Sequence, residues 1–208
     1  MSTPAHNMVD ENSAKERFYT DRAHDTALID YPLDGDSVVF ELGGFAGEWS
    51  EKIYSKYKCN LFIFEPVGSF YQSLLEKFRG DAKVKIFNYG ILNKNDTLDI
   101  GVCNDGSSFF SSSDTVQRVE VKSIENVLVS LGVPHVDLIQ INIEGSEYAL
   151  LDYMIDANLV SLFRYIQIQF HKNVPDAEIR RDRIVQGLEK THTRIFNYEF
   201  VFESWKIK

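Results

Sequence analysis

Residues 38–47 read Val-Val-Phe-Glu-Leu-Gly-Gly-Phe-Ala-Gly and carry the strongest structural signal in the chain. The first three are apolar, which predicts a short buried strand that ends at Glu41. Gly43, Gly44 and Gly47 predict a tight loop before a helix that begins near Glu48. Such a loop exposes backbone N–H groups to a bulky ligand, because no Cβ stands in the way.

The spacing of the glycines distinguishes two kinds of ligand. A dinucleotide fold usually has Gly-x-Gly-x-x-Gly, whereas this loop reads acid-x-Gly-x-x-x-Gly, with Phe45 where the second glycine would be. The pattern suits a ligand that has no pyrophosphate but has an amino-acid end for Glu41 and the loop to hold. It therefore favours S-adenosylmethionine over NAD.

Length and composition bound the class of protein. A chain of 208 residues predicts one domain with a large core, and a net charge of −9 argues against nucleic acid as the main partner. Cys59 and Cys103 are too few for a disulfide framework or a zinc cluster. The sequence has no membrane span of roughly 18 apolar residues and no signal-peptide core, so we expect a cytoplasmic protein.

Segments with strand and helix patterns alternate along the chain. Residues 1–14 are expected to be a disordered tail, and residues 15–208 one domain whose first helix lies between Ala14 and Ile29. Residues 97–122 lack a helical period and predict an inserted pair of short strands, and residues 193–207 predict a closing β-hairpin. Further buried strands are expected at residues 61–64, 84–87, 136–143 and 165–170. The fold class is therefore α/β, a single Rossmann-like domain with a mostly parallel sheet, helices on both faces and an antiparallel C-terminal edge hairpin.

Ligands of open parallel sheets bind at the carboxyl ends of the strands, so the residues at those ends are candidates for the site. In chain order they are Glu41, Glu65, Asn88, Gly90, Asn142, Glu144, Glu147, Gln169 and His171. Glu65 follows Gly43 by 22 residues, a spacing that brings an acid to the ribose of an adenosine. A carboxylate there can accept hydrogen bonds from both ribose hydroxyls, although a solvated helix cap is the alternative.

The remaining candidates also have structural alternatives. Glu144 and Glu147 span a strand end and the first turn of a helix, where acids are stabilised by the helix dipole without any function. His171 could be a loop histidine whose bonds are satisfied within the protein. Ser107, Ser108 and residues 111–113 form a serine-rich loop that is either flexible surface or an overhang above the pocket.

Five motifs in order resemble the FkbM-type, S-adenosylmethionine-dependent methyltransferases of class I fold, and the resemblance runs from about Asp36 to Trp205. The motifs are the loop from Glu41 to Gly47, Phe64-Glu65-Pro66, Gly106-Ser107-Ser108, the helix start from Lys122 to Glu125, and the stretch from Asp137 to Glu147. The strand Gln-Ile-Gln-Phe-His171 and the closing Phe-Glu-Ser-Trp205 resemble one branch of that family. The chain departs from the commonest pattern at Gln140, Asn142 and Gln169, where many members have ionisable residues.

The resemblance implies a methyltransferase that acts on a hydroxyl of a sugar or another small molecule, in polysaccharide or secondary-metabolite synthesis. It implies a cofactor site formed by Glu41, Gly43, Gly47, Glu65, Asn88, Gly90 and Asn142. A hydroxyl needs a base as it attacks, and His171 is the first candidate and Glu144 the second. The three amides leave too few carboxylates for a hard-cation site, so no metal is expected.

Two other functions remain open on the sequence alone. One is a non-catalytic module that binds the cofactor, which the three amides would permit, and the other is a nicotinamide-dependent oxidoreductase. The acceptor is not identified, and the oligomeric state is open, with a homodimer among the options. We also expect Gly43→Val to abolish cofactor binding and to leave the fold largely intact.

Overall fold

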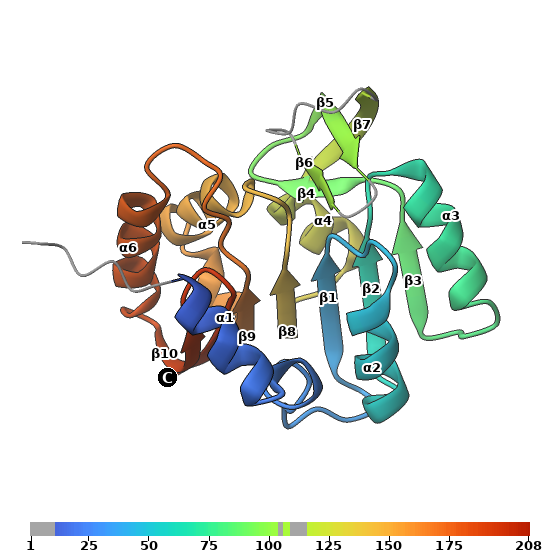
Figure 1. Ribbon diagram of the computed structural model, residues 1–208. Coiled ribbons are helices and arrows are strands. Elements are labelled where there is room, and N and C mark those ends of the chain that lie inside the picture. Colours follow the sequence, from blue (N-terminus) through green and yellow to red (C-terminus); the bar gives the residue numbers. More distant parts are fainter. Residues whose placement is uncertain (1–10, 104–105, 109–115) are drawn as a thin grey trace, which may run out of the picture.

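The computed structural model describes residues 11–103, 106–108 and 116–208. These residues form a seven-stranded sheet with the order β10-β11-β9-β8-β1-β2-β3 and a four-stranded sheet with the order β4-β7-β5-β6 (Figure 1). The second sheet lies beyond the carboxyl ends of the central strands of the first.

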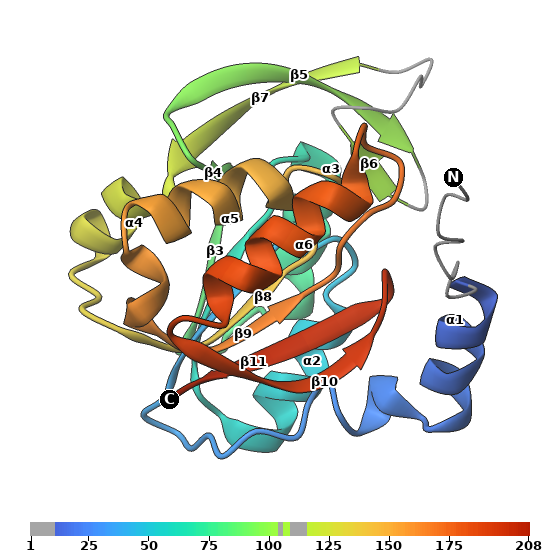
Figure 2. The ribbon, with the colours of Figure 1, turned by 90° about the vertical axis from the view of Figure 1, so that its left-hand side faces the viewer.

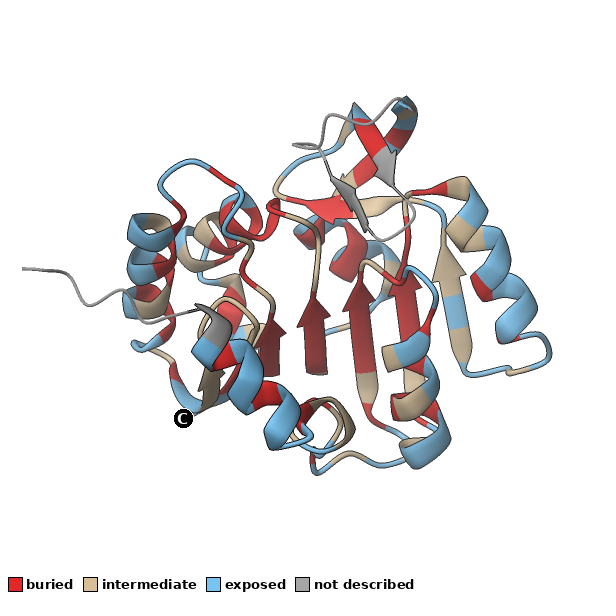
Figure 3. Cartoon of the chain, in the orientation of Figure 1, coloured by how far each residue is buried: buried red, intermediate tan, exposed pale blue. Residues whose placement is uncertain are grey.

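The core of the main sheet is parallel, as the alternation of strands and helices predicts. Its parallel strands are β1 (Val38–Leu42), β2 (Asn60–Phe64), β3 (Val84–Phe87), β8 (Val136–Ile141) and β9 (Phe163–Ile168). The hairpin of β10 (His192–Tyr198) and β11 (Phe202–Ile207) adds two antiparallel strands beside β9. Figure 3 shows that the central strands are buried, which explains why they are apolar almost throughout. The predicted fold class is confirmed.

Helices cover both faces of the main sheet (Figures 1 and 2). On one face, α4 (Ile124–Leu131), α5 (Glu147–Asp156) and α6 (Ala177–Leu188) pack against Phe40 and Ile139. On the other face, α2 (Glu48–Tyr57) and α3 (Gly68–Lys77) pack against Val39 and Leu61. None of the helices in the described ranges has the length and apolar content needed to cross a membrane.

The N-terminal segment differs in detail from the expected single helix. Helix α1 spans Glu11–Thr20, so it begins before Ala14 and ends well before Ile29. A short 3-10 helix, η1 (Ala23–Asp25), follows it, and a second one, η2 (Leu159–Leu162), precedes β9. Arg22 has a left-handed backbone (φ 51°), which separates helix α1 from η1. Most of the expected tail, residues 1–10, lies outside the described residues.

The insertion predicted between residues 97 and 122 as a pair of short strands is part of the larger, four-stranded second sheet. Its strands are β4 (Gly90–Leu92), β5 (Asp96–Cys103), β6 (Gly106–Ser108) and β7 (Val116–Ser123), with β5 antiparallel to both β6 and β7. The second sheet packs against Val67, in the loop between β2 and α3, through Leu92, Ile100 and Val121. Ser107 and Ser108 lie in β6, whereas residues 111–113 of the serine-rich loop lie outside the described residues.

Candidate active site

A cavity lies between the carboxyl ends of the main strands and the second sheet, where the sequence predicts a ligand. Five of the nine predicted site residues line it: Gly43, Glu65, Gly90, Asn142 and Glu144. The other four, which do not line it, are Glu41, Gly47, Asn88 and His171.

One wall of the cavity is apolar, and the sequence did not reveal it. The rings of Phe45 and Phe70 meet edge to face, with centroids 4.6 Å apart, and both line the cavity. Ile100 and Val121 contribute from the second sheet. Phe45 has a left-handed backbone (φ 43°), which a bulky side chain rarely adopts, so the surrounding loop must hold it there. The sequence signal that could have indicated this apolar wall is Phe45, an aromatic residue inside the glycine loop.

Glu65 connects two loops of the cavity. Its Oε2 accepts a hydrogen bond from the Phe45 N–H at 2.8 Å, and its Oε1 accepts one from the Val67 N–H at 2.8 Å. Burial raises the pKa of this carboxyl, and the backbone N–H donors oppose the shift. Each oxygen retains a lone pair, so the fixed carboxylate can accept further hydrogen bonds from a ligand.

The loop glycines are required by packing against the protein itself. Gly43 has φ +87°, and a Cβ there would lie 2.1 Å from the carbonyl oxygen of Asn142. Gly47 has φ +70°, and a Cβ there would lie 2.7 Å from Cδ2 of Leu74. The expectation that Gly43→Val leaves the fold intact is therefore wrong, because the new side chain would push apart the ends of β1 and β8.

Glu41 and Asn88 make hydrogen bonds within the protein and do not line the cavity. The Glu41 carboxyl is buried and accepts a hydrogen bond from the Ser50 hydroxyl. Burial, together with the nearby charge of Glu65, raises the pKa of Glu41 to about 8. Asn88 is exposed, and its Nδ2 donates to the carbonyl oxygens of Glu65 at 3.0 Å and Pro66 at 3.1 Å. Asn88 thus holds the end of β2 in place.

Asn142 lines the cavity and has a side-chain acceptor that is not used within the described part of the protein. Its backbone N–H donates to the Leu42 carbonyl at 3.1 Å, which extends the pairing of β8 with β1. Its Oδ1 is buried and has no hydrogen-bond partner among the described residues. A buried acceptor without a donor is costly, so this atom is suited to a donor on a ligand.

His171 lies between two carboxylates at the end of β9. Its Nε2 is 3.5 Å from Oε1 of Glu144, and its Nδ1 is 3.2 Å from Oε1 of Glu147, which is fully buried. Burial alone would lower the pKa of His171, but the two carboxylates outweigh it and raise the pKa to about 9. The imidazole therefore carries a positive charge at neutral pH.

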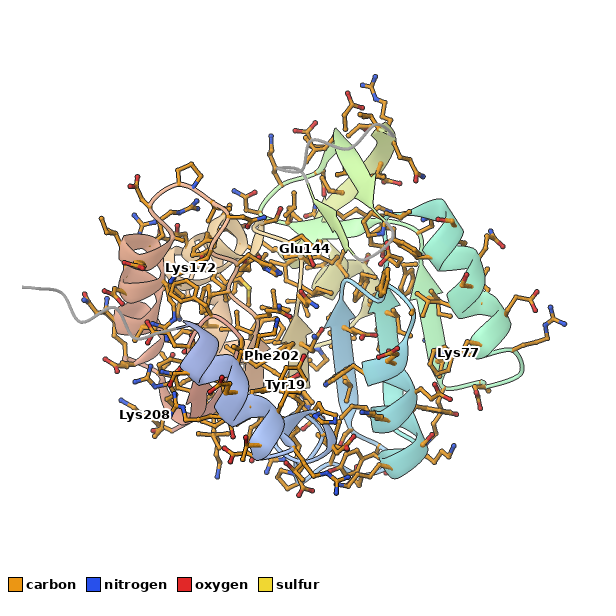
Figure 4. All side chains as sticks on the ribbon, viewed as in Figure 1. Tyr19, Lys77, Glu144, Lys172, Phe202 and Lys208 are labelled. Carbon is orange, nitrogen blue, oxygen red and sulfur yellow. The ribbon has the colours of Figure 1, made fainter. Side chains whose placement is uncertain are left out.

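Glu144 is the carboxylate of this cluster that lines the cavity, and Figure 4 labels its place in the molecule. Its side chain is 30% exposed, whereas that of His171 is 13% exposed. In the parts of the chain that the structure describes, no three His, Cys, Asp or Glu side chains are arranged so that they could hold a metal ion. The absence of a metal requirement stays a prediction.

Comparisons with known proteins bear on the class of this site. The family described as "Methyltransferase FkbM domain" matches residues 41–198, more than half of the chain. No curated protein matches the sequence.

Several solved structures are similar in fold. The chain in the crystal structure of a fibrillarin/Nop5p complex has a TM-score of 0.54 at 13% identity, over 89% of this chain and 79% of that one. The N-methyltransferase NodS from Bradyrhizobium japonicum WM9 has a TM-score of 0.50 at 11% identity, over 96% and 99%. A dimethyladenosine transferase from Plasmodium falciparum has a TM-score of 0.50 at 11% identity, over 98% and 64%. At such identities these similarities show the fold alone.

Proposed function

The chain belongs to the FkbM family of methyltransferases, and from this premise we propose that it methylates a hydroxyl oxygen of a sugar or another small molecule. The observation that carries the proposal is the Glu144 carboxylate, which lines the cavity beside the charged His171. The class I fold implies S-adenosylmethionine as the methyl donor.

The residues of the cavity fit this cofactor. When bound, S-adenosylmethionine supplies a methyl group that its sulfonium centre makes electrophilic. Glu65 would hold the ribose hydroxyls with its free lone pairs, and the unpartnered Oδ1 of Asn142 would accept from a donor of the amino-acid end. Phe45 and Phe70 offer an apolar surface for the adenine ring.

Glu144 is the better candidate for the base. An alkyl hydroxyl is a weak nucleophile, so a nearby group must accept its proton as it attacks. His171 was the first candidate on the sequence, but a histidine with a pKa of about 9 already carries its proton at neutral pH. Glu144 reaches the cavity itself, so we assign the proton to its carboxylate and an ion-pairing role to His171.

The charges of the site favour an uncharged acceptor. Glu65 and Glu144 both line the cavity, and the whole chain has a net charge of −9. A phosphate or carboxylate group on the acceptor would approach these acids unfavourably. A sugar or other neutral polyol, as in polysaccharide or secondary-metabolite synthesis, avoids this repulsion.

The test is methyl transfer from radiolabelled S-adenosylmethionine to a panel of neutral sugars and small alcohols, with sugar phosphates and amines for comparison. An O-methyl ether is stable to alkali, whereas a methyl ester is hydrolysed, so the product identifies the acceptor atom. Labelling of amines alone would contradict the proposal. Activity that survives a chelator would agree with the predicted absence of a metal.

Glu144→Gln should reduce turnover by roughly 10²–10⁴-fold, the usual weight of general base catalysis. Affinity for S-adenosylhomocysteine should change little, and Glu125→Gln in the first turn of α4 serves as the matched control. If Glu144 is the base, turnover does not depend on deprotonation of His171, so it should not rise as the pH passes through about 9. A rise of turnover through that pH would instead identify neutral His171 as the base.

A further inference from the structure

Glu147 is the first residue of α5, and its side chain is fully buried. An acid at the start of a helix is stabilised by the helix dipole, but acidic side chains are seldom fully buried unless they are paired. Here the carboxylate turns back from the helix. Its Oε2 accepts from the Gly145 N–H at 2.8 Å, and its Oε1 accepts from the His171 N–H at 2.8 Å. Glu147 therefore joins the turn after β8 to the turn after β9.

The turn that Glu147 closes is strained. Glu144 has φ 54° and Gly145 has φ 102°, so two consecutive residues have left-handed backbones. A residue with a side chain holds such a conformation only where its surroundings enforce it. The hydrogen bond from Gly145 to Glu147 is one such restraint, and the resulting turn places Glu144 on the cavity wall.

Glu147 also sets the orientation of the His171 ring. Because Nδ1 lies 3.2 Å from the Glu147 carboxylate, Nε2 is directed to Glu144 at 3.5 Å. The Tyr148 hydroxyl donates to the His171 carbonyl at 2.8 Å and fixes the backbone. Three cations lie nearby: Arg180 of α6 over Tyr148, Arg181 of α6 over Phe170, and Lys172 over Phe200 and 3.6 Å from the Glu178 carboxylate.

We propose that Glu147 is a positioning residue, which holds Glu144 at the cavity wall and turns the His171 imidazole toward it. The inference rests on the proposed role of Glu144 as the base, but its test requires no methyl acceptor. The positioning role explains why the Glu147 carboxylate is buried at the start of α5, because a carboxylate that only capped the helix would not need to be buried.

The experiment is an NMR titration of the His171 imidazole nitrogens in the full-length protein. In the unaltered protein, Nδ1 should be protonated at pH 7.5, because it donates to Glu147. Glu147→Gln keeps the size of the side chain but removes the charge, so the apparent pKa of His171 should fall by one unit or more from about 9. Glu125→Gln, the same change in the first turn of α4, should leave it unaltered.

Calorimetry with S-adenosylhomocysteine provides a second readout, and the affinity of Glu147→Gln should stay within about threefold of the parent. An unchanged His171 titration in a folded Glu147→Gln variant would overturn the inference. If that variant does not fold, the nitrogen signals of His171 in the unaltered protein still test the inference. A neutral ring protonated only at Nε2 could not donate to Glu147 and would overturn it. If Glu144→Gln retained full turnover while Nδ1 of His171 were protonated, Glu144 would be rejected as the base, but the inference about Glu147 would stand.

Discussion

A single carboxylate, Glu65, joins the loop after β1 to the loop after β2. The sequence identified this residue from its spacing and its Phe-Glu-Pro context, since an acid at the end of the second strand has a fixed place relative to the glycine loop. Its contacts to the N–H groups of Phe45 and Val67 could not be foreseen, because they depend on how the two loops pack.

Glu65→Ala should weaken the binding of S-adenosylhomocysteine by roughly 1.5–3 kcal/mol, the worth of hydrogen bonds to a charged group. It should also destabilise the protein, because the N–H groups of Phe45 and Val67 lose their acceptor. Calorimetry and urea denaturation measure the two effects. Glu76→Ala, at an exposed position of α3, is the control. Unchanged affinity in Glu65→Ala would remove this residue from the ribose site.

His171 shows what a residue-by-residue reading of the sequence omits. The residue type and its place at a strand end were predictable, but its charge state was not. The charge depends on Glu144 and on Glu147, whose side chain is fully buried beside the imidazole. A sequence pattern specifies which residues are near one another along the chain, whereas the pKa depends on which carboxylates lie within a few ångströms.

Among the elements, the second sheet is the one whose role was least predictable. The lack of a helical period indicated strands, and β5 and β7 confirm it. That Ile100 and Val121 would line the ligand cavity depends on how this sheet docks above the main one. The position of the second sheet depends on packing between residues that are distant in sequence, and the periodicity of a short segment does not predict such packing.

The register of the main sheet places Gln140, one of the departures from the commonest family pattern, among other buried polar residues. Gln140 pairs with Glu41 on one side and with Gln167 on the other, and Gln167 pairs with Ser204. All four side chains are buried, so they form a polar row across four strands. An ionisable side chain at position 140 would place a second buried ionisable group in this row beside Glu41, whereas an amide does not.

The C-terminal hairpin is held to α6 by a buried ion pair. Arg181 donates from Nε to Glu203 at 2.9 Å, and both side chains are almost fully buried. Arg181→Met should cost about 3–5 kcal/mol of unfolding free energy, because it removes the hydrogen-bonded partner of the buried Glu203 and leaves only Arg194, 3.8 Å away, as a cationic partner among the described residues. Urea denaturation measures the loss, and the double variant Arg181→Met/Glu203→Gln should recover part of it.

The matched control for this pair lies on the same helix. Arg183 is 67% exposed and pairs with Asp152, so Arg183→Met should cost less than about 1 kcal/mol. Equal losses in the two single variants would mean that the buried pair contributes no more than a surface one.

At the scale of the whole molecule, the cavity joins the two sheets, so a ligand there should stabilise the entire domain. A ligand that binds only the folded state at 100 times its Kd adds about 2.7 kcal/mol. For a chain of this size, each kcal/mol raises Tm by about 2–4 °C, so S-adenosylhomocysteine should raise Tm by roughly 5–11 °C. NAD at the same concentration should produce no shift, because Phe45 replaces the second glycine of the dinucleotide loop. Differential scanning fluorimetry makes the comparison, with Glu65→Ala as the variant in which the shift should shrink. A shift with NAD that equals the shift with S-adenosylhomocysteine would contradict the cofactor specificity inferred from the loop.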